Sequence, residues 1–152
     1  MNMLVKNKAL KELEPHLDNI YQWLSNEAES EAIHPEWLNQ TGLIYQAYSG
    51  NFSRSEDCFR LALIHAEKKG NPREKALALT NLGVLFLDQN RSAEAVETFT
   101  TLKPLIAKHF GEESRETATA CQNLASAYRL DGKEDKAKLE RIESTRILRK
   151  LT

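Results

Sequence analysis

Hydrophobic residues recur along most of the chain at intervals of three and four, the spacing that places them on one face of an α-helix. The first such stripe contains Leu10, Leu13, Leu17, Ile20 and Leu24. It runs through Pro15, which either begins a second helix or kinks a single one, and we favour a break near residues 13–14. Nothing later in the chain matches this segment. Residues 1–33 are therefore expected to form an N-terminal helical cap, made of one helix or a helix pair.

A longer pattern occurs twice between residues 76 and 137, and its two copies are 42 residues apart. The matched positions are Asn81 and Asn123, Leu82 and Leu124, Phe86 and Tyr128, and Ala95 and Ala137. Self-similarity at a fixed period of this size indicates a helical solenoid. Because one pair of helices leaves an apolar face open, the next pair is expected to stack on it.

Turn-forming residues divide the rest of the chain into three expected helix pairs, at about 34–70, 71–111 and 112–152, in one continuous domain. Pro35 begins the first pair, since the missing N–H of proline costs nothing in the first turn of a helix. Gly111 is expected to end the second pair and Ser114 to cap the start of the third. The expected turns within and between pairs are Ser49-Gly50-Asn51, Gly70-Asn71-Pro72, Gln89-Asn90-Arg91 and Asp131-Gly132.

Small residues are expected where the two helices of each pair cross. They are Gly42, Gly83 and Ala125 on the first helices, and Ala95 and Ala137 on the second. Small side chains allow two helices to approach closely, and large residues are expected to fill the space beside them. These large residues are Tyr45, Phe59, Phe86, Phe99 and Tyr128.

The pattern resembles the tetratricopeptide repeat, whose signature combines a large residue, Leu-Gly, an aromatic, a turn glycine, alanine, a second aromatic and alanine. The second pair supplies Leu79, Leu82, Gly83, Phe86, Ala95 and Phe99. The third pair supplies Cys121, Leu124, Ala125, Tyr128, Gly132 and Ala137. The first pair supplies Leu38, Gly42, Tyr45, Gly50, Phe52, Phe59 and Ala62, with one extra residue between Gly42 and Gly50. The 42-residue period is more similar to the kinesin-light-chain variety than to the usual 34-residue repeat.

This resemblance implies an all-α fold, a right-handed α-solenoid of about three helix pairs behind the N-terminal cap. The third pair departs from the family signature, because Arg141 and Ser144 stand where the family has an aromatic residue and alanine. Ser92 and Glu134 also replace the aromatic residue that follows the turn. We therefore interpret the last helix as a solvated cap.

The resemblance also implies a concave groove, lined by the first helix of each pair, that takes an extended peptide or a partner helix. The implied groove residues are Asn39, Gln40, Leu43, Leu77, Thr80, Asn81, Val84, Thr119, Gln122, Asn123, Ser126 and Arg129. Gln40, Asn81 and Asn123 could form a ladder of amides, which both donate to and accept from a peptide backbone. Alternatively, each amide is solvated or bonds the neighbouring helix. Arg129 is the one basic residue among the groove positions, which argues against a clamp for a C-terminal carboxylate.

We therefore expect a non-enzymatic interaction scaffold that binds a protein or peptide partner. The alternative is a module that forms a homodimer or joins a larger complex through its cap and C-terminal helix. The chain has 21 basic and 22 acidic residues and a net charge of −1, which argues against nucleic-acid binding. No apolar run approaches the ~18 residues of a membrane span, so a cytoplasmic protein is expected.

The residues that could carry chemistry are sparse. Cys58 and Cys121 lack CxxC spacing and are expected to be buried free thiols. The four histidines, His16, His34, His65 and His109, are scattered, and Asp131, Lys133 and Asp135 do not complete a calcium loop. We find no phosphate-binding loop and no nucleophile motif, so no metal, cofactor or catalytic residue is expected. Trp23 and Trp37 are interpreted as core residues.

Overall fold

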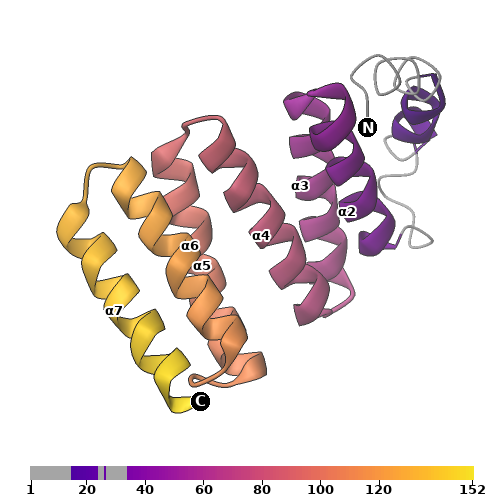
Figure 1. The fold of residues 1–152 in the computed structure, drawn as a ribbon. Helices are drawn as coiled ribbons and strands as arrows, with labels where there is room; N and C mark the ends of the chain where they lie inside the picture. The colour runs from indigo at the N-terminus through magenta and orange to yellow at the C-terminus, as the bar shows by residue number, and fades with distance from the viewer. Residues whose placement is uncertain (1–14, 24–25, 27–33) are drawn as a thin grey trace. The chain divides into compact units, whose positions relative to one another are not determined.

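The computed structural model describes residues 15–23, 26 and 34–152, and these residues form helices joined by short turns (Figure 1). Most of the expected N-terminal cap lies outside the described residues, although 15–23 are helical. The elements that follow are α2 (Pro35–Ile44), η1 (Tyr45–Ser49), α3 (Phe52–Lys68), α4 (Pro72–Asp88), α5 (Ser92–Phe110), α6 (Arg115–Leu130) and α7 (Glu134–Lys150). The all-helical class predicted from the periodicity is confirmed for this part of the chain. The chain divides into two compact units, residues 1–74 and 75–152, and each is described by itself.

In the first unit, α2 and α3 pack together at a crossing that requires glycine. A Cβ atom at Gly42 would lie 2.5 Å from Cε1 of Phe59, and Phe59 is fully buried. The crossing is reinforced by Ser55, whose hydroxyl donates to the carbonyl oxygen of Gly42 at 2.8 Å. The side chain of Asn51 caps α3 by accepting a hydrogen bond from the backbone N–H of Arg54 at 3.1 Å. These contacts confirm the predicted close approach at Gly42.

Helix 15–23 packs against η1 and α3 through a mixed apolar and polar cluster. Leu17, Tyr45 and Cys58 form its buried core. The Tyr45 hydroxyl donates to the carbonyl oxygen of Leu17 at 2.7 Å, and burial raises the pKa of Tyr45 to about 12. Around the rim, Arg54 pairs with Asp18. The described part of the N-terminal segment is therefore joined to the first helix pair by its own hydrogen bonds.

The π-helix η1 accounts for the extra residue that the sequence shows before Gly50. Gly42 and Phe59 are 17 residues apart, whereas the equivalent Gly83 and Phe99 are 16 apart. A π-helical turn holds one residue more than an α-helical turn. The insertion is thus contained in residues 45–49, and the glycine still meets the phenylalanine.

In the second unit, α4 and α5 repeat the same crossing. A Cβ atom at Gly83 would lie 2.5 Å from both Cε1 and Cζ of Phe99, which is fully buried. Helix α5 then packs against α6, and α6 packs against α7. Lys103 on α5 reaches Glu140 on α7, with 2.7 Å between Nζ and Oε2. This ion pair therefore joins α5 to α7, and α6 packs against both of these helices.

The α6–α7 crossing differs from the other two. Ala125 occupies the glycine position, and Arg141 occupies the position of Phe59 and Phe99. Ala125, Ala137 and Arg141 line a hollow of about 200 Å³, and Arg141 is exposed. Farther along α7, Ser144 is buried, and its hydroxyl is the one buried side-chain polar atom without a hydrogen-bond partner among the described residues. The departures from the repeat pattern thus leave a hollow and an unpartnered hydroxyl at this helix pair.

The helix ends follow the sequence signals closely. The hydroxyl of Ser114 accepts a hydrogen bond from the backbone N–H of Thr117 at 3.1 Å, so the predicted cap is confirmed. Gly111, with φ of 97°, ends α5 as expected. Asn90 adopts a φ of 57° at the turn between α4 and α5, where the third pair has Gly132. Asparagine is among the few residues that enter this conformation readily.

We predict that Gly83→Val lowers the stability of the second unit by about 2 kcal/mol, because the added carbons overlap the buried ring of Phe99. The measurement is thermal unfolding by circular dichroism, with a midpoint about 5 °C lower. As a control, Phe99→Leu is added to the variant. The double variant should lose less stability than the two single losses added together, since the leucine vacates the contested space. An unchanged midpoint for Gly83→Val would contradict the close approach.

We also predict that Ser144→Ala raises stability by about 1 kcal/mol. The change removes a buried hydroxyl that lacks a partner and introduces a better helix former. Urea unfolding measures the gain. The matched control is Ser92→Ala, which should lower stability because the Ser92 hydroxyl donates to Oδ1 of Asp131 at 2.8 Å. A loss of stability in both variants, Ser144→Ala as well as Ser92→Ala, would contradict the assignment of Ser144 as unpartnered.

Candidate functional site

Helices α4 and α6 each present one narrow open stripe between buried flanks. On α4 the open positions include Leu77, Asn81 and Val84, whereas Ala76, Ala78, Leu79, Leu82, Gly83, Leu85 and Phe86 are buried. On α6 the equivalent open positions are Thr119, Asn123 and Ser126, 42 residues later. The spacing of four and three residues places each set on one helix face. The implied groove residues of the second unit therefore form two matching stripes.

The two stripes meet at the C-terminal ends of α4 and α6. Leu87 of α4 and Ser126, Arg129 and Leu130 of α6 line one hollow. Ser126 and Arg129, with Gln122, also line the hollow at the crossing of α6 and α7. The structure thus brings the C-terminal end of α4 beside the last turn of α6, within the second unit.

The stripes combine apolar surface with amide groups. Leu77 and Val84 are 38% and 37% exposed, which is high for large hydrophobic residues in a helix with two buried flanks. Asn81 and Asn123 are partly exposed, so neither amide is sealed inside. An amide donates and accepts at the same time, and both functions match those of a peptide backbone. The α4 stripe can therefore offer apolar contacts beside its amide, whereas the α6 stripe offers an amide beside small hydroxyl side chains.

The hydroxyl groups beside these amides are already engaged within their own helices. Thr80 donates to the carbonyl oxygen of Ala76 at 2.8 Å. Thr119 donates to Arg115 at 3.0 Å, and Ser126 donates to Gln122 at 3.1 Å. Their donor capacity is consumed, because a hydroxyl has a single hydrogen. On α6, the amides of Gln122 and Asn123 are therefore better suited than these hydroxyls to contact a ligand backbone.

The first unit holds Asn39, Gln40 and Leu43, the remaining groove residues that the resemblance implies. These residues differ in their exposure to solvent. Gln40 and Leu43 are exposed on α2. Asn39 is fully buried, and its Nδ2 donates to Oε2 of Glu74 at 3.4 Å. Its amide thus serves the interior of the first unit instead of a surface. The sequence carried no local signal for this contact, because the two residues are 35 positions apart.

The two tryptophans do not form core, and this sequence interpretation was wrong. Trp23 is 47% exposed and Trp37 is 51% exposed. The ring of Trp37 lies 5.2 Å from the ring of His34, centre to centre. Leu17 and Tyr45, not the tryptophans, provide the buried contacts between helix 15–23 and the first helix pair.

Both cysteines are buried free thiols, as predicted. Burial raises the pKa of Cys58 to about 12, and the charge of Asp57 adds to this effect. Burial likewise raises the pKa of Cys121 to about 11. A thiol in this state is a poor nucleophile at neutral pH, because the thiolate is the reactive form. Across the described residues, no group of three or more His, Cys, Asp and Glu side chains could hold a metal ion.

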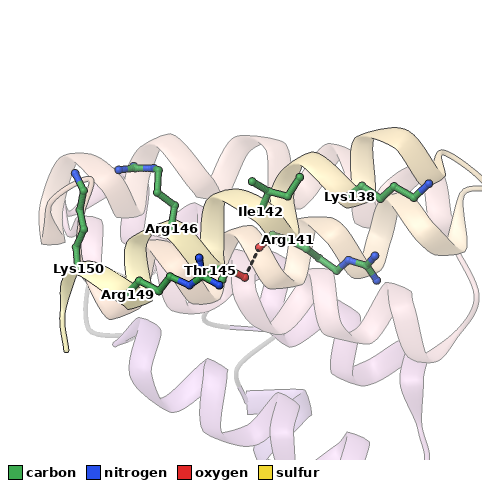
Figure 2. Close-up of a pocket in the computed structure, with 7 residues that line it drawn as sticks. All are labelled: Lys138, Arg141, Ile142, Thr145, Arg146, Arg149 and Lys150. Atoms are coloured by element: carbon green, nitrogen blue, oxygen red, sulfur yellow. Dashed lines mark hydrogen bonds between the residues drawn. The ribbon is translucent and has the colours of Figure 1, made fainter.

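The sequence predicted a solvated last helix, and the outer face of α7 is indeed exposed, but the apolar residues on that face were not singled out. Leu139 and Ile142 are 66% and 65% exposed, more than any other large hydrophobic residue in the described part of the chain. Ile142 lines a hollow together with six other side chains of the same helix, five of them basic (Figure 2). The mixture of exposed apolar and basic residues was visible in the sequence. The sequence did not show which side of α7 would remain uncovered by other helices.

Comparison with protein-family models and with curated proteins finds no match to this chain. Within the described residues, no helix combines the length and the apolar character needed to cross a membrane.

We predict that neither cysteine of the folded protein reacts with a thiol reagent at pH 8, because both are buried and remain protonated at that pH. The measurement follows the absorbance released by an aromatic disulfide reagent. Addition of urea should expose two reactive thiols per chain. Rapid reaction of one thiol without denaturant would contradict the packing around that cysteine.

Proposed function

We propose that this protein is a non-enzymatic interaction scaffold of the tetratricopeptide-repeat type, a right-handed α-solenoid that binds a peptide segment or a partner helix. The single observation that carries the proposal is the pair of matching stripes on α4 and α6. Each stripe sets a partly exposed asparagine beside small or apolar open positions, and the two copies stand 42 residues apart. A repeated surface of this kind suits a ligand that is itself repetitive, namely a polypeptide backbone.

Asn81 and Asn123 are proposed to hydrogen-bond the backbone of the ligand at two successive levels. Leu77 and Val84 would contact its apolar side chains, and Gln122 would add a further amide. Arg129, at the shared hollow, would favour an acidic group at one end of the ligand. Because a backbone contact does not depend on the side chains of the ligand, this arrangement would leave sequence selectivity to the apolar contacts and Arg129.

The chemically reactive groups discussed above are buried or already paired. Both thiols are buried with raised pKa values, and no metal-binding group is found among the described side chains. Lys103 is likewise committed, because its ammonium donates to Glu140. The proposal therefore assigns these groups no catalytic role.

We predict that Asn81→Ala combined with Asn123→Ala weakens peptide binding roughly 30-fold, since two hydrogen bonds of about 1 kcal/mol each would be lost. The probe is a 12-residue peptide selected from a random display library on the wild-type protein. Titration calorimetry measures the dissociation constant, and circular dichroism checks that helicity is retained.

The matched control is Asn19→Ala combined with Gln22→Ala, which removes two exposed amides from helix 15–23. This control should bind the selected peptide as the wild type does. Equal binding by the α4–α6 variant and the wild type would refute the proposed role of the two asparagines. Failure to select any peptide from a diverse library would count against the scaffold function itself.

A further inference from the structure

The open face of α7, defined as Lys138, Arg141, Ile142, Thr145 and Arg149, corresponds to a covered face elsewhere in the same unit. Helix α5 lies 42 residues earlier, so Val96, Phe99, Lys103 and Ala107 are the counterparts of Lys138, Arg141, Thr145 and Arg149. Those four α5 residues are buried or half-buried, whereas the four α7 residues are all exposed. The difference lies in what packs on each helix.

Helix α6 covers this face of α5 at Lys103, whereas Phe99 packs against Gly83 of α4. Helices α5 and α6 pack together, and the ammonium group of Lys103 interacts with Cys121 of α6. On α7 the position of Lys103 is taken by Thr145, at the centre of the open face, and nothing in the described residues packs there (Figure 2). At the Lys103 and Thr145 positions, the fold therefore contains one occupied and one vacant copy of a helix contact.

The vacant position differs in chemistry from the occupied one. Val96, Phe99 and Ala107 are replaced by Lys138, Arg141 and Arg149, so an apolar face becomes a basic one. None of these three cations pairs with a carboxylate among the described residues. Ile142 supplies an exposed apolar centre between them.

Two neighbouring cations, by contrast, are neutralised internally. Arg146 bonds Glu113 at 3.0 Å and Glu143 at 2.8 Å, and Lys150 pairs with Glu113. The hydrogen bonds from Lys150 and Arg146 lower the pKa of Glu113, so this carboxylate stays charged at neutral pH. The charge available to a partner is thus concentrated on Lys138, Arg141 and Arg149.

We propose that the open face of α7 docks an acidic amphipathic helix of a partner protein. A helix is favoured as the partner because α6, itself a helix, packs on α5 at the equivalent Lys103 position. The open face extends over about three helical turns, or roughly 17 Å, which a partner helix of about 12 residues would span. Carboxylates on that helix would pair with the three cations, and one apolar residue would cover Ile142. A second copy of this chain fits less well, since a twofold axis at α7 would bring six unpaired cations into one interface.

The test uses three synthetic, dye-labelled, alanine-based helical peptides and fluorescence anisotropy. The first carries glutamates on both sides of a leucine stripe, the second has lysines in place of the glutamates, and the third is a scrambled version of the first without a stripe. We expect the wild-type chain to bind the glutamate peptide at least tenfold more tightly than either of the others. Binding should weaken as salt concentration rises.

Variants of the open face make the test specific. Ile142→Asp should reduce affinity for the glutamate peptide at least tenfold. Lys138→Glu combined with Arg149→Glu should reverse the preference, so that the lysine peptide binds instead. The matched controls are Ile64→Asp, an exposed isoleucine on α3, and Lys108→Glu combined with Arg115→Glu, two exposed cations elsewhere. Both controls should bind as the wild type does.

Several outcomes would overturn the proposal. They are equal binding of all three peptides, unchanged binding by Ile142→Asp, and binding to anionic lipid vesicles in preference to the glutamate peptide. Sedimentation that shows a wild-type dimer lost in Ile142→Asp would assign the face to a second copy and also overturn it. A peptide selected on the α4–α6 stripes should bind Ile142→Asp normally, so failure here is distinguishable from failure of the proposed scaffold function.

Discussion

The close approach of two helices at a glycine is the constraint on which the helix pairs depend. At Gly42 and Gly83 the backbone of one helix lies so near a phenylalanine ring of the other that a methyl group would overlap it. Glycine is unfavourable inside helices, and here the cost is offset by burial of Phe59 and Phe99. Because each ring is fixed by the helix facing it, the crossing sets the separation of the pair.

Much of this arrangement could be predicted from the sequence, because the signals are local. Hydrophobic spacing identified the helices, and Gly111 and Ser114 marked ends that the structure confirms. The glycine and phenylalanine positions followed from the 42-residue period. Buried Asn39 could not be predicted, since its partner Glu74 lies in a different helix, and partial exposure of Trp23 and Trp37 depends on which neighbours reach them. Such features arise from tertiary contacts that no periodicity encodes.

The third helix pair shows how two substitutions alter an end of the fold. Arg141 in place of an aromatic residue leaves a hollow beside Ala125, and Ser144 in place of alanine buries a hydroxyl without a partner. Both changes set the α6–α7 crossing apart from the two others. The same substitution at Arg141 adds a cation to a face that is apolar in the preceding pair. Stability and surface chemistry at this end are therefore linked through one side chain.

The π-helical turn η1 has a consequence for how this chain can vary in length. One residue added to an ordinary α-helix rotates every later side chain by about 100° and would carry the partner phenylalanine away from its glycine. A single widened turn absorbs that rotation before the next helix begins, so Gly42 still faces Phe59. Helical pairs of unequal length can thus share one mode of contact, and evolution can lengthen the first helix of a pair without redesigning the second.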